Sequence, residues 1–296
     1  MTTIPTFALA ALVLFSGSIA YGQGAFTIDV PGARSTRVFG LNAQGDMCGS
    51  ILDASGERVA FVRSREGEFT LFAFPGSTLT QCRGINAAGQ MVGVHRTPDN
   101  KLHGFIKDGD EYISIDVPGS IDTRGFGIDP SGQIVGKYVS PDGRTHGYLF
   151  GRDGFVTIDV PGAIATEASG IMPDGRITGV YQTPDTKFHG YILSGNGFEP
   201  VDVPGAVSTG TANGGLWMSS STELAGYYPQ ALGSGLNRAF LRLRDETYES
   251  YLYPGSVDTC FFNINERGDI VGFYRDTALQ DHGLFIERQG RQPPGQ

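Results

Sequence analysis

A Pro-Gly pair that returns six times along the chain restricts the fold more than any other feature. Successive pairs begin 44, 43, 43, 43 and 50 residues apart. In every copy the pair is followed by Ala or Ser, two variable residues and a threonine. The prolines are Pro31, Pro75, Pro118, Pro161, Pro204 and Pro254, and the threonines are Thr36, Thr80, Thr123, Thr166, Thr209 and Thr259. Self-similarity at such a period predicts a repeat architecture, in which each copy is one unit packed on its neighbours.

Each copy contains four short runs rich in Val, Ile, Phe and Tyr, bounded by Gly, Pro, Asp and Ser, and such runs are strand signals. Three connections are tight turns, which join neighbouring antiparallel strands. The Pro-Gly segment is the longest regular connection, and its proline cannot continue a ladder, so we place the crossover between sheets there. The sequence therefore predicts an all-β fold, a six-bladed β-propeller with four antiparallel strands per blade. A β-solenoid is the alternative, although three tight reversals per repeat do not coil well.

The two ends of the repeat region complement each other. The first strand, residues 26–30, stands alone before the first complete copy, and the last copy stops at residue 288 without its outer strand. We expect the N-terminal strand to complete the C-terminal blade, because this pairing closes the ring and removes two exposed edges. Residues 24–288 are therefore predicted to form one propeller domain, followed by a short flexible tail at 289–296.

The N-terminus has the pattern of an export signal. An uncharged apolar run at residues 7–15 is followed by small residues, and Ser18 and Ala20 fit the rule for cleavage after Ala20. We expect residues 1–20 to be a signal peptide and the mature chain to be secreted, extracellular or periplasmic. The apolar run is too short to span a bilayer, and we expect no membrane span in the mature chain.

The net charge argues against one class of partner, and the cysteine content argues against a disulfide framework. The formal net charge is −9, whereas a nucleic-acid-binding surface needs a basic stripe. The three cysteines, Cys48, Cys82 and Cys260, are an odd number without repeat spacing and do not form a disulfide framework. We interpret Cys48 as a small core residue and expect no bond between Cys82 and Cys260. No nucleic acid is predicted as a partner, and we expect a monomer.

The repeat unit resembles that of a known family. Residues 84–93 read Gly-Ile-Asn-Ala-Ala-Gly-Gln-Met-Val-Gly, and His-Gly-Phe follows at 103–105. Units of this kind resemble those of the bacterial extracellular HAF-repeat family over nearly the whole mature chain, although most copies here have Gly where the family name expects Ala. The resemblance implies a secreted, propeller-like repeat protein and brings no established activity or catalytic residues.

The recurring polar residues are interpreted as scaffold. His103, His146 and His189 are 43 residues apart and His282 is in phase, but they belong to four different blades, whereas zinc needs ligands that converge on one point. We expect each histidine to make a hydrogen bond within its blade, and each repeated threonine to bond the local backbone. No metal site and no cofactor are predicted. Sequence motifs of serine hydrolases, zinc proteases and phosphate-binding loops are absent.

A binding site is expected where the repeat varies. The starts of the inner strands carry Arg37, Arg83 and Arg124, and their guanidinium forks can converge on an anionic group such as a sugar acid. The competing interpretation is that they pair with Asp122 and Glu167 at a solvated rim. The fifth copy is another candidate, because it carries insertions and the single tryptophan, Trp217.

These features predict a binding or interaction module with a carbohydrate or small anionic ligand at a channel mouth. Two alternatives stay open. One is an extracellular polysaccharide hydrolase or lyase, which needs ionisable groups poised together at one end of the axis. The other is a structural component of an envelope or matrix.

Overall fold

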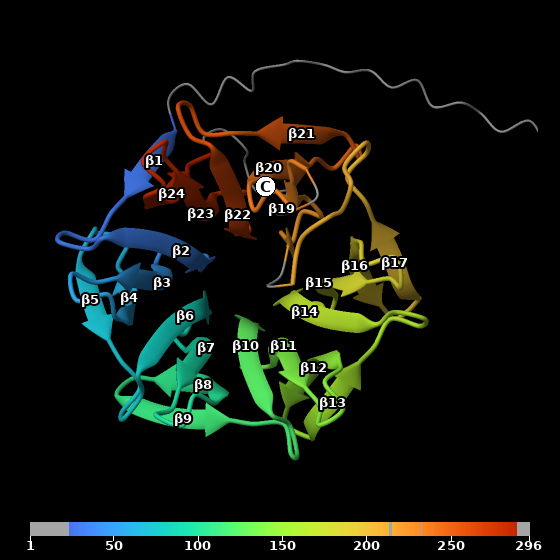
Figure 1. The fold of residues 1–296 in the computed structure, drawn as a ribbon, viewed down its shortest axis with the longest axis horizontal. Helices are drawn as coiled ribbons and strands as arrows, with labels where there is room; N and C mark the ends of the chain where they lie inside the picture. Colours follow the sequence, from blue (N-terminus) through green and yellow to red (C-terminus); the bar gives the residue numbers. More distant parts are fainter. Residues whose placement is uncertain (1–23, 213–214, 232, 289–296) are drawn as a thin grey trace, which may run out of the picture.

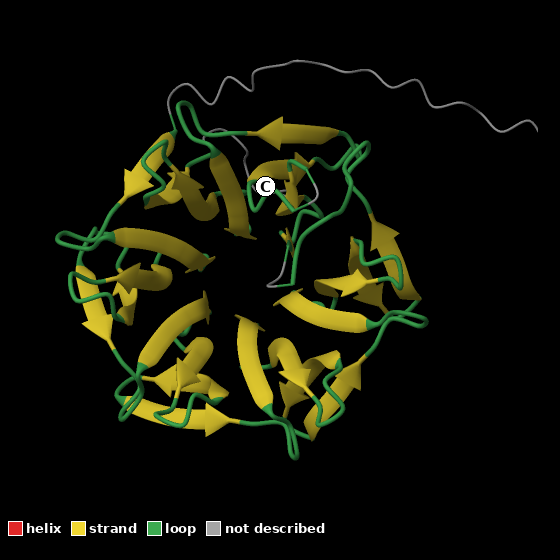
Figure 2. Cartoon of the chain, viewed as in Figure 1, coloured by secondary structure: helices red, strands yellow, loops and turns green. Residues whose placement is uncertain are grey.

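The computed structural model describes residues 24–212, 215–231 and 233–288. The predicted signal peptide and tail lie outside these ranges. Six four-stranded blades surround a central axis in the order of the sequence (Figure 1). The described residues contain strands, turns and loops but no helix (Figure 2), so none of them forms a helix long and apolar enough to cross a membrane. The predicted all-β propeller with six four-stranded blades is confirmed.

The blades share one strand order, from the axis to the rim. The inner strands are β2 (Ser35–Leu41), β6 (Leu79–Ile85), β10 (Asp122–Ile128), β14 (Ala165–Ile171), β18 (Leu216–Met218) and β22 (Asp258–Ile264). The second strands are β3 (Met47–Leu52), β7 (Met91–Arg96), β11 (Ile134–Val139), β15 (Ile177–Gln182), β19 (Leu224–Pro229) and β23 (Ile270–Arg275). The third strands are β4 (Arg58–Arg63), β8 (Leu102–Asp108), β12 (Thr145–Gly151), β16 (Phe188–Ser194), β20 (Asn237–Arg242) and β24 (Asp281–Ile286). The outer strands are β5 (Phe69–Phe72), β9 (Glu111–Ile115), β13 (Gly154–Ile158), β17 (Gly197–Val201), β21 (Tyr248–Tyr251) and β1 (Ala25–Ile28).

The ring closes as the sequence predicts. Strand β1 pairs antiparallel with β24, with Ala25 opposite Ile286 and Ile28 opposite Gly283, and Figure 1 shows the blue N-terminal strand beside the red C-terminal blade. His282 Nδ1 and Asp29 Oδ2 lie 2.7 Å apart across this junction. Burial lowers the pKa of His282, but the contacts with Asp29 and Asp276 outweigh it and raise the pKa above its ordinary value. The last blade is therefore built from both ends of the described chain.

The core lies between neighbouring blades. A bulky side chain of the third strand, such as Phe61, Phe105, Tyr148 or Tyr191, is fully buried in blades 1 to 4. Opposite it, the second strand has a glycine: a Cβ at Gly136 would lie 2.9 Å from the Tyr148 ring. Glycine at this position leaves room for the aromatic ring, which explains why glycine recurs as the third residue of the second strands.

Candidate functional site

The repeated threonines fix the turn that precedes every inner strand. In each blade the threonine hydroxyl accepts a hydrogen bond, 2.9 to 3.2 Å long, from the backbone N–H six residues earlier. The donors are Val30, Phe74, Val117, Val160, Val203 and Tyr253. The bond ties the residue before each Pro-Gly turn to the strand that follows, which confirms the scaffold role expected for the threonines. In blades 1, 2, 3 and 6 the next residue borders one end of the central channel.

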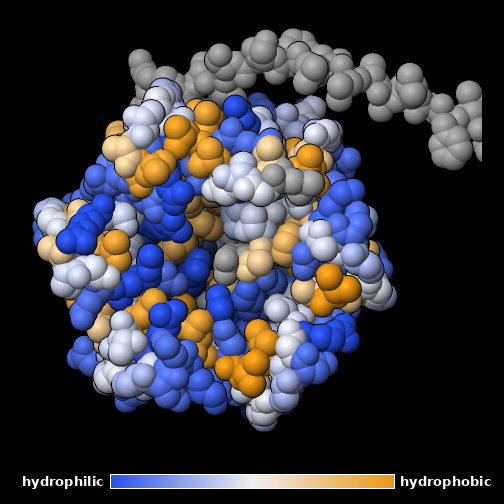
Figure 3. Space-filling model, in the orientation of Figure 1, coloured by the Kyte–Doolittle hydropathy of each residue, from blue (hydrophilic) through white to orange (hydrophobic). Residues whose placement is uncertain are grey.

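Four arginines line that end of the channel. A cavity of about 340 Å³ is bordered by Arg37 of blade 1, Arg83 of blade 2, Arg124 of blade 3 and Arg275 of blade 6. We call this cavity the arginine mouth. The space-filling view shows one face of the ring, hollowed around its axis, with many hydrophilic side chains nearby (Figure 3). The predicted convergence of the first three arginines is thus present in the structure. Arg275 was not predicted because it lies at the end of a second strand.

Three of these arginines pair with carboxylates. Arg37 donates from Nε to Asp281 Oδ2 at 2.8 Å, and Arg275 donates from Nε to Asp281 Oδ1 at 2.6 Å. Burial raises the pKa of Asp281, but these two arginines outweigh it and lower the pKa below its usual value. Arg124 donates to Asp122 at 2.8 and 3.0 Å. Pairing with Asp122, the competing interpretation of the sequence, therefore describes Arg124.

Arg83 differs from the other three. Its guanidinium carbon lies 4.2 Å from the centre of the Phe39 ring and 5.6 Å from that of Phe126. Its one side-chain hydrogen bond among the described residues is a long one, from Nη2 to Gln81 Oε1 at 3.4 Å, and its buried Nε has no partner there. Burial lowers its pKa to about 10. Arg83 is thus a charged group held between rings without a carboxylate beside it in the described part of the chain.

The irregular fifth blade contributes to the same mouth. Thr211, Gly235 and Asn237 line the cavity, and all three lie in or beside the insertions of the fifth copy. The Asn237 backbone N–H donates to Asp258 Oδ1 at 2.9 Å, and Thr211 Oγ1 lies 3.1 Å from Tyr227 Oη. The insertions therefore lie beside the arginines, which agrees with the expectation that variable copies build binding features.

Two predicted site residues lie elsewhere. Glu167 pairs with Lys137 at 2.9 Å, and both side chains are buried, at 3% and 7% exposure, so Glu167 does not pair with the arginines. Trp217 lies at the opposite end of the channel. The strand register of the fifth blade explains this placement. Gly215, and not Gly210, is the residue equivalent to Arg37 of blade 1, because its carbonyl occupies the same place beside the second strand. The inserted residues follow Thr209, so this inner strand begins later than the threonine spacing indicates, at Leu216.

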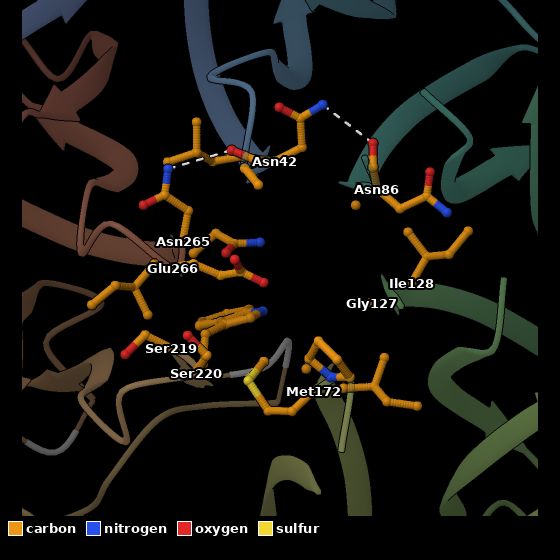
Figure 4. A pocket seen from close by; sticks show the side chains of 18 of the residues that line it. Asn42, Asn86, Gly127, Ile128, Met172, Ser219, Ser220, Asn265 and Glu266 are labelled. Atoms are coloured by element: carbon orange, nitrogen blue, oxygen red, sulfur yellow. Dashed lines mark hydrogen bonds between the residues drawn. The ribbon is translucent and has the colours of Figure 1, made fainter. Parts of the chain in front are cut away.

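The opposite end of the channel is built from the last residues of the inner strands. This cavity has a volume of about 130 Å³ and is bordered by asparagines, serines and a ring of apolar residues. Asn265 donates to the Asn42 carbonyl at 3.3 Å, Asn42 to the Asn86 carbonyl at 3.2 Å, and Asn86 to the Asp129 carbonyl at 3.0 Å. Figure 4 shows the first two of these bonds joining three blades. We call this cavity the asparagine mouth.

Aromatic side chains lie between the two mouths. Phe39 and Phe262 border the arginine mouth, with ring centres 4.9 Å apart, and Trp217 borders the asparagine mouth. The Trp217 and Phe262 rings meet edge to face at 5.5 Å. On the side of blades 1, 5 and 6, this aromatic layer separates the two cavities.

The histidines make the predicted bonds within their blades. Nδ1 of His103, His146 and His189 lies 2.8 to 3.0 Å from Asp116, Asp159 and Asp202, respectively. No group of three or more potential metal ligands gathers in the described ranges.

One of the repeated histidines also has a serine beside it. His146 Nε2 lies 3.2 Å from Ser140 Oγ, so the order of groups matches a Ser-His-Asp triad. The Ser140 hydroxyl, however, donates to Asp142, so its proton is not directed at the histidine. The serine caps its turn.

Comparison with known proteins identifies the architecture. No family model and no curated protein matches the chain. Among solved structures, Aleuria aurantia lectin in complex with α-methyl-L-fucoside is 16% identical, with a TM-score of 0.54 over 90% of this chain and 95% of the lectin. AofleA from Arthrobotrys oligospora is 12% identical, with a TM-score of 0.57 over 90% and 86%. SapL1 lectin in complex with α-methyl fucoside is 13% identical, with a TM-score of 0.57 over 89% and 98%. The fold of Aleuria aurantia lectin is described as a six-bladed β-propeller, and this chain has that fold.

Proposed function

We propose that this protein is an exported binding module whose arginine mouth takes a carbohydrate bearing a carboxylate, or a similar small anion. The observation that carries the proposal is Arg83, a cation that faces a 340 Å³ cavity with no carboxylate partner among the described residues. A planar guanidinium binds a carboxylate through two parallel hydrogen bonds.

The surroundings of Arg83 support a carbohydrate. Phe39, Phe262, Phe273 and Tyr227 border the cavity together with the polar side chains of Gln81 and Asn237. Cavities that bind small molecules combine apolar walls with a few placed polar groups. The lectins that share this fold were crystallised with fucosides, which supports a sugar ligand for this chain.

An enzyme working at this mouth is less well supported. A hydrolase or lyase needs an acid and a base that are free to exchange protons with a substrate. The carboxylates of Asp122, Asp258 and Asp281 each lie within 4 Å of an arginine nitrogen. Burial raises the pKa of Asp258, but this carboxylate also accepts the Asn237 N–H. These carboxylates hold arginines in place, which suits binding better than catalysis.

Export, oligomeric state and family concern the whole chain. We propose that residues 1–20 direct export, that the mature protein is a monomer, and that it belongs with the HAF-repeat proteins its units resemble. The structural alternative, an envelope or matrix component without a small ligand, is distinguished from a binding module by the same experiment.

The test is a glycan array that contains acidic and neutral sugars, probed with the mature protein and with Arg83→Gln. We expect binding to uronic- or sialic-acid glycans, weakened about tenfold or more in Arg83→Gln, because the charged fork is lost. Arg65→Gln is the matched control, since Arg65 is exposed and pairs with Glu66 far from the mouth. Arg37 is left intact because it holds Asp281. Binding that is equal in wild type and Arg83→Gln, or confined to neutral glycans, contradicts the proposed site.

A further inference from the structure

The asparagine mouth contains three polar side chains without partners. Trp217 Nε1, the Asn263 amide and the Glu266 carboxylate all belong to residues that border this cavity. None of the three makes a hydrogen bond or ion pair with another residue of the described ranges. The three residues come from blades 5 and 6, on one side of the channel.

Two of these residues replace a glycine of the repeat. The inner strands of blades 1 to 4 have Gly40, Gly84, Gly127 and Gly170 at this position. A Cβ at Gly84 would lie 2.8 Å from the Phe126 carbonyl oxygen, and one at Gly127 would lie 2.9 Å from the Ser169 carbonyl oxygen. Glycine at this position therefore allows neighbouring blades to pack closely. Trp217 and Asn263 occupy the equivalent place in blades 5 and 6, where they add an indole and an amide to the cavity wall.

Glu266 is the carboxylate of this cavity. Figure 4 shows its side chain directed toward the centre of the pocket. The neighbouring Arg267 does not neutralise it, because that arginine donates to Asp269 Oδ2 at 2.8 Å and to the Ala43 carbonyl at 2.9 Å. Opposite Glu266, the wall is apolar and includes Ile128 and Met172.

From this set of groups we infer that the asparagine mouth is a second binding site, for a small organic ammonium compound that also carries hydroxyl groups. Glu266 accepts hydrogen bonds from the ammonium group, and charge-assisted bonds of this kind are the strong ones. Trp217 Nε1 donates to a ligand oxygen, and the Asn263 amide both donates and accepts. Ile128 and Met172 contact the carbon skeleton. Amino sugars and amino alcohols belong to this class.

This site is independent of the arginine mouth. The aromatic layer with Phe39, Phe262 and Trp217 lies between the two cavities. The two cavities differ in the sign of their summed charge, since four arginines and Asp258 line one, whereas Glu266 is the charged residue among the described residues that line the other. A change at Arg83 therefore does not reach the ammonium site, and failure of one proposal leaves the other testable.

The experiment uses isothermal titration calorimetry of the mature protein with glucosamine, and with glucose as the comparator that lacks the ammonium group. We expect glucosamine to bind at least about tenfold more tightly than glucose, and the difference to shrink as salt screens the charge. Glu266→Gln should abolish the preference. Asn263→Gly, which restores the glycine of the other blades, should weaken glucosamine binding without unfolding the protein.

Two controls make the outcome decisive. Glu111→Gln changes an exposed carboxylate on the outer strand of blade 2 and should leave glucosamine binding unchanged, as should Arg83→Gln. The inference is overturned if wild type does not bind glucosamine, if it binds glucose equally well, or if Glu266→Gln retains the full preference. Loss of glucosamine binding in Arg83→Gln alone would assign the ligand to the arginine mouth. That result would also overturn the inference.

Discussion

The guanidinium of Arg83 occupies surroundings that disfavour its charge. Its Nε is buried without a hydrogen-bond partner in the described part of the chain, and burial lowers its pKa to about 10. The contact with the Phe39 ring, at 4.2 Å, offsets part of this cost. A buried charge without a partner destabilises a fold, so this residue is better explained by binding than by stability.

Replacing Arg83 with methionine should therefore stabilise the protein. We expect an increase of about 1 kcal/mol in the free energy of unfolding, because the side chain keeps its contact with Phe39 and loses the buried charge. Urea denaturation measures the difference. Arg124→Met is the comparison and should lose stability, since it leaves Asp122 without the arginine. A less stable Arg83→Met protein would show that the arginine is structural.

His95 stands where four other blades have a tyrosine, and three of these tyrosines bond to the outer strand. Tyr138, Tyr228 and Tyr274 reach a hydroxyl of the outer strand with their own hydroxyl groups, at 2.7 to 3.0 Å. His95 makes the corresponding contact to Ser114 at 3.3 Å and stacks on Phe74, but its buried Nδ1 has no described partner. Burial, with the nearby His103, lowers the pKa of His95 to about 4.

This depressed pKa predicts acid sensitivity. The folded-state pKa lies below the unfolded value of 6.5, so the stabilisation is present above pH 6.5 and is lost as the pH falls toward 4. The loss in the free energy of unfolding should approach about 3 kcal/mol as the pH falls to 4 and below. His95→Tyr introduces the residue found in blades 3 to 6 and should flatten the stability profile between pH 7 and 4. Thermal melting across this range tests it, and an unchanged slope in the variant would contradict it.

At the scale of the element, the inner strand depends on its threonine. The Thr123 hydroxyl accepts the Val117 N–H at 3.2 Å and lies 2.8 Å from Ser120 Oγ, with the side chain fully buried. The bond fixes the turn that delivers Arg124 to the channel.

Thr123→Val should lower the free energy of unfolding by about 1–3 kcal/mol, because a buried N–H is left without an acceptor. Thr145→Val changes a half-buried threonine on the third strand of the same blade and should cost less. Equal losses in the two variants, measured by urea denaturation, would show that the turn bond is not the cause.

The repeat predicts regular elements well and irregular ones poorly. Period and turn spacing place all six blades, and the strand phase brings Arg37, Arg83 and Arg124 to one mouth. The fifth blade departs because its inner strand has only three residues, Leu216–Met218, and lacks the bulge seen in blades 1 to 4 and 6. An insertion hides that register, and so the repeat does not predict at which end of the channel Trp217 lies. Lys137, the partner of Glu167, is not a repeated residue, so the repeat does not predict this ion pair.

At the scale of the whole molecule, the ring is closed by a strand of four residues. Strand β1 covers the edge of β24, and Ile28 and Val30 belong to the core that joins blades 6 and 1. Each blade buries its faces against its neighbours, so one open junction exposes two faces.

Deleting residues 24–30 should lower the melting temperature of the entire domain. We expect a single transition shifted down by more than about 5 °C, because the loss spreads through the ring. Differential scanning calorimetry distinguishes this from local fraying. A melting temperature within one or two degrees of the mature protein would show that the strand is dispensable.

The pairing of β1 with β24 also determines how the ring responds to mechanical force. Ala25 lies opposite Ile286, so the two strand ends where the chain leaves the sheet are adjacent. Tension applied between them loads the antiparallel ladder one pair of hydrogen bonds at a time, as in the opening of a zipper, instead of shearing all pairs together. A propeller tethered at one end and pulled at the other yields first at blade 6 and at low force. Blades 1 to 4, including the three arginines at the start of their inner strands, stay folded while that seam opens.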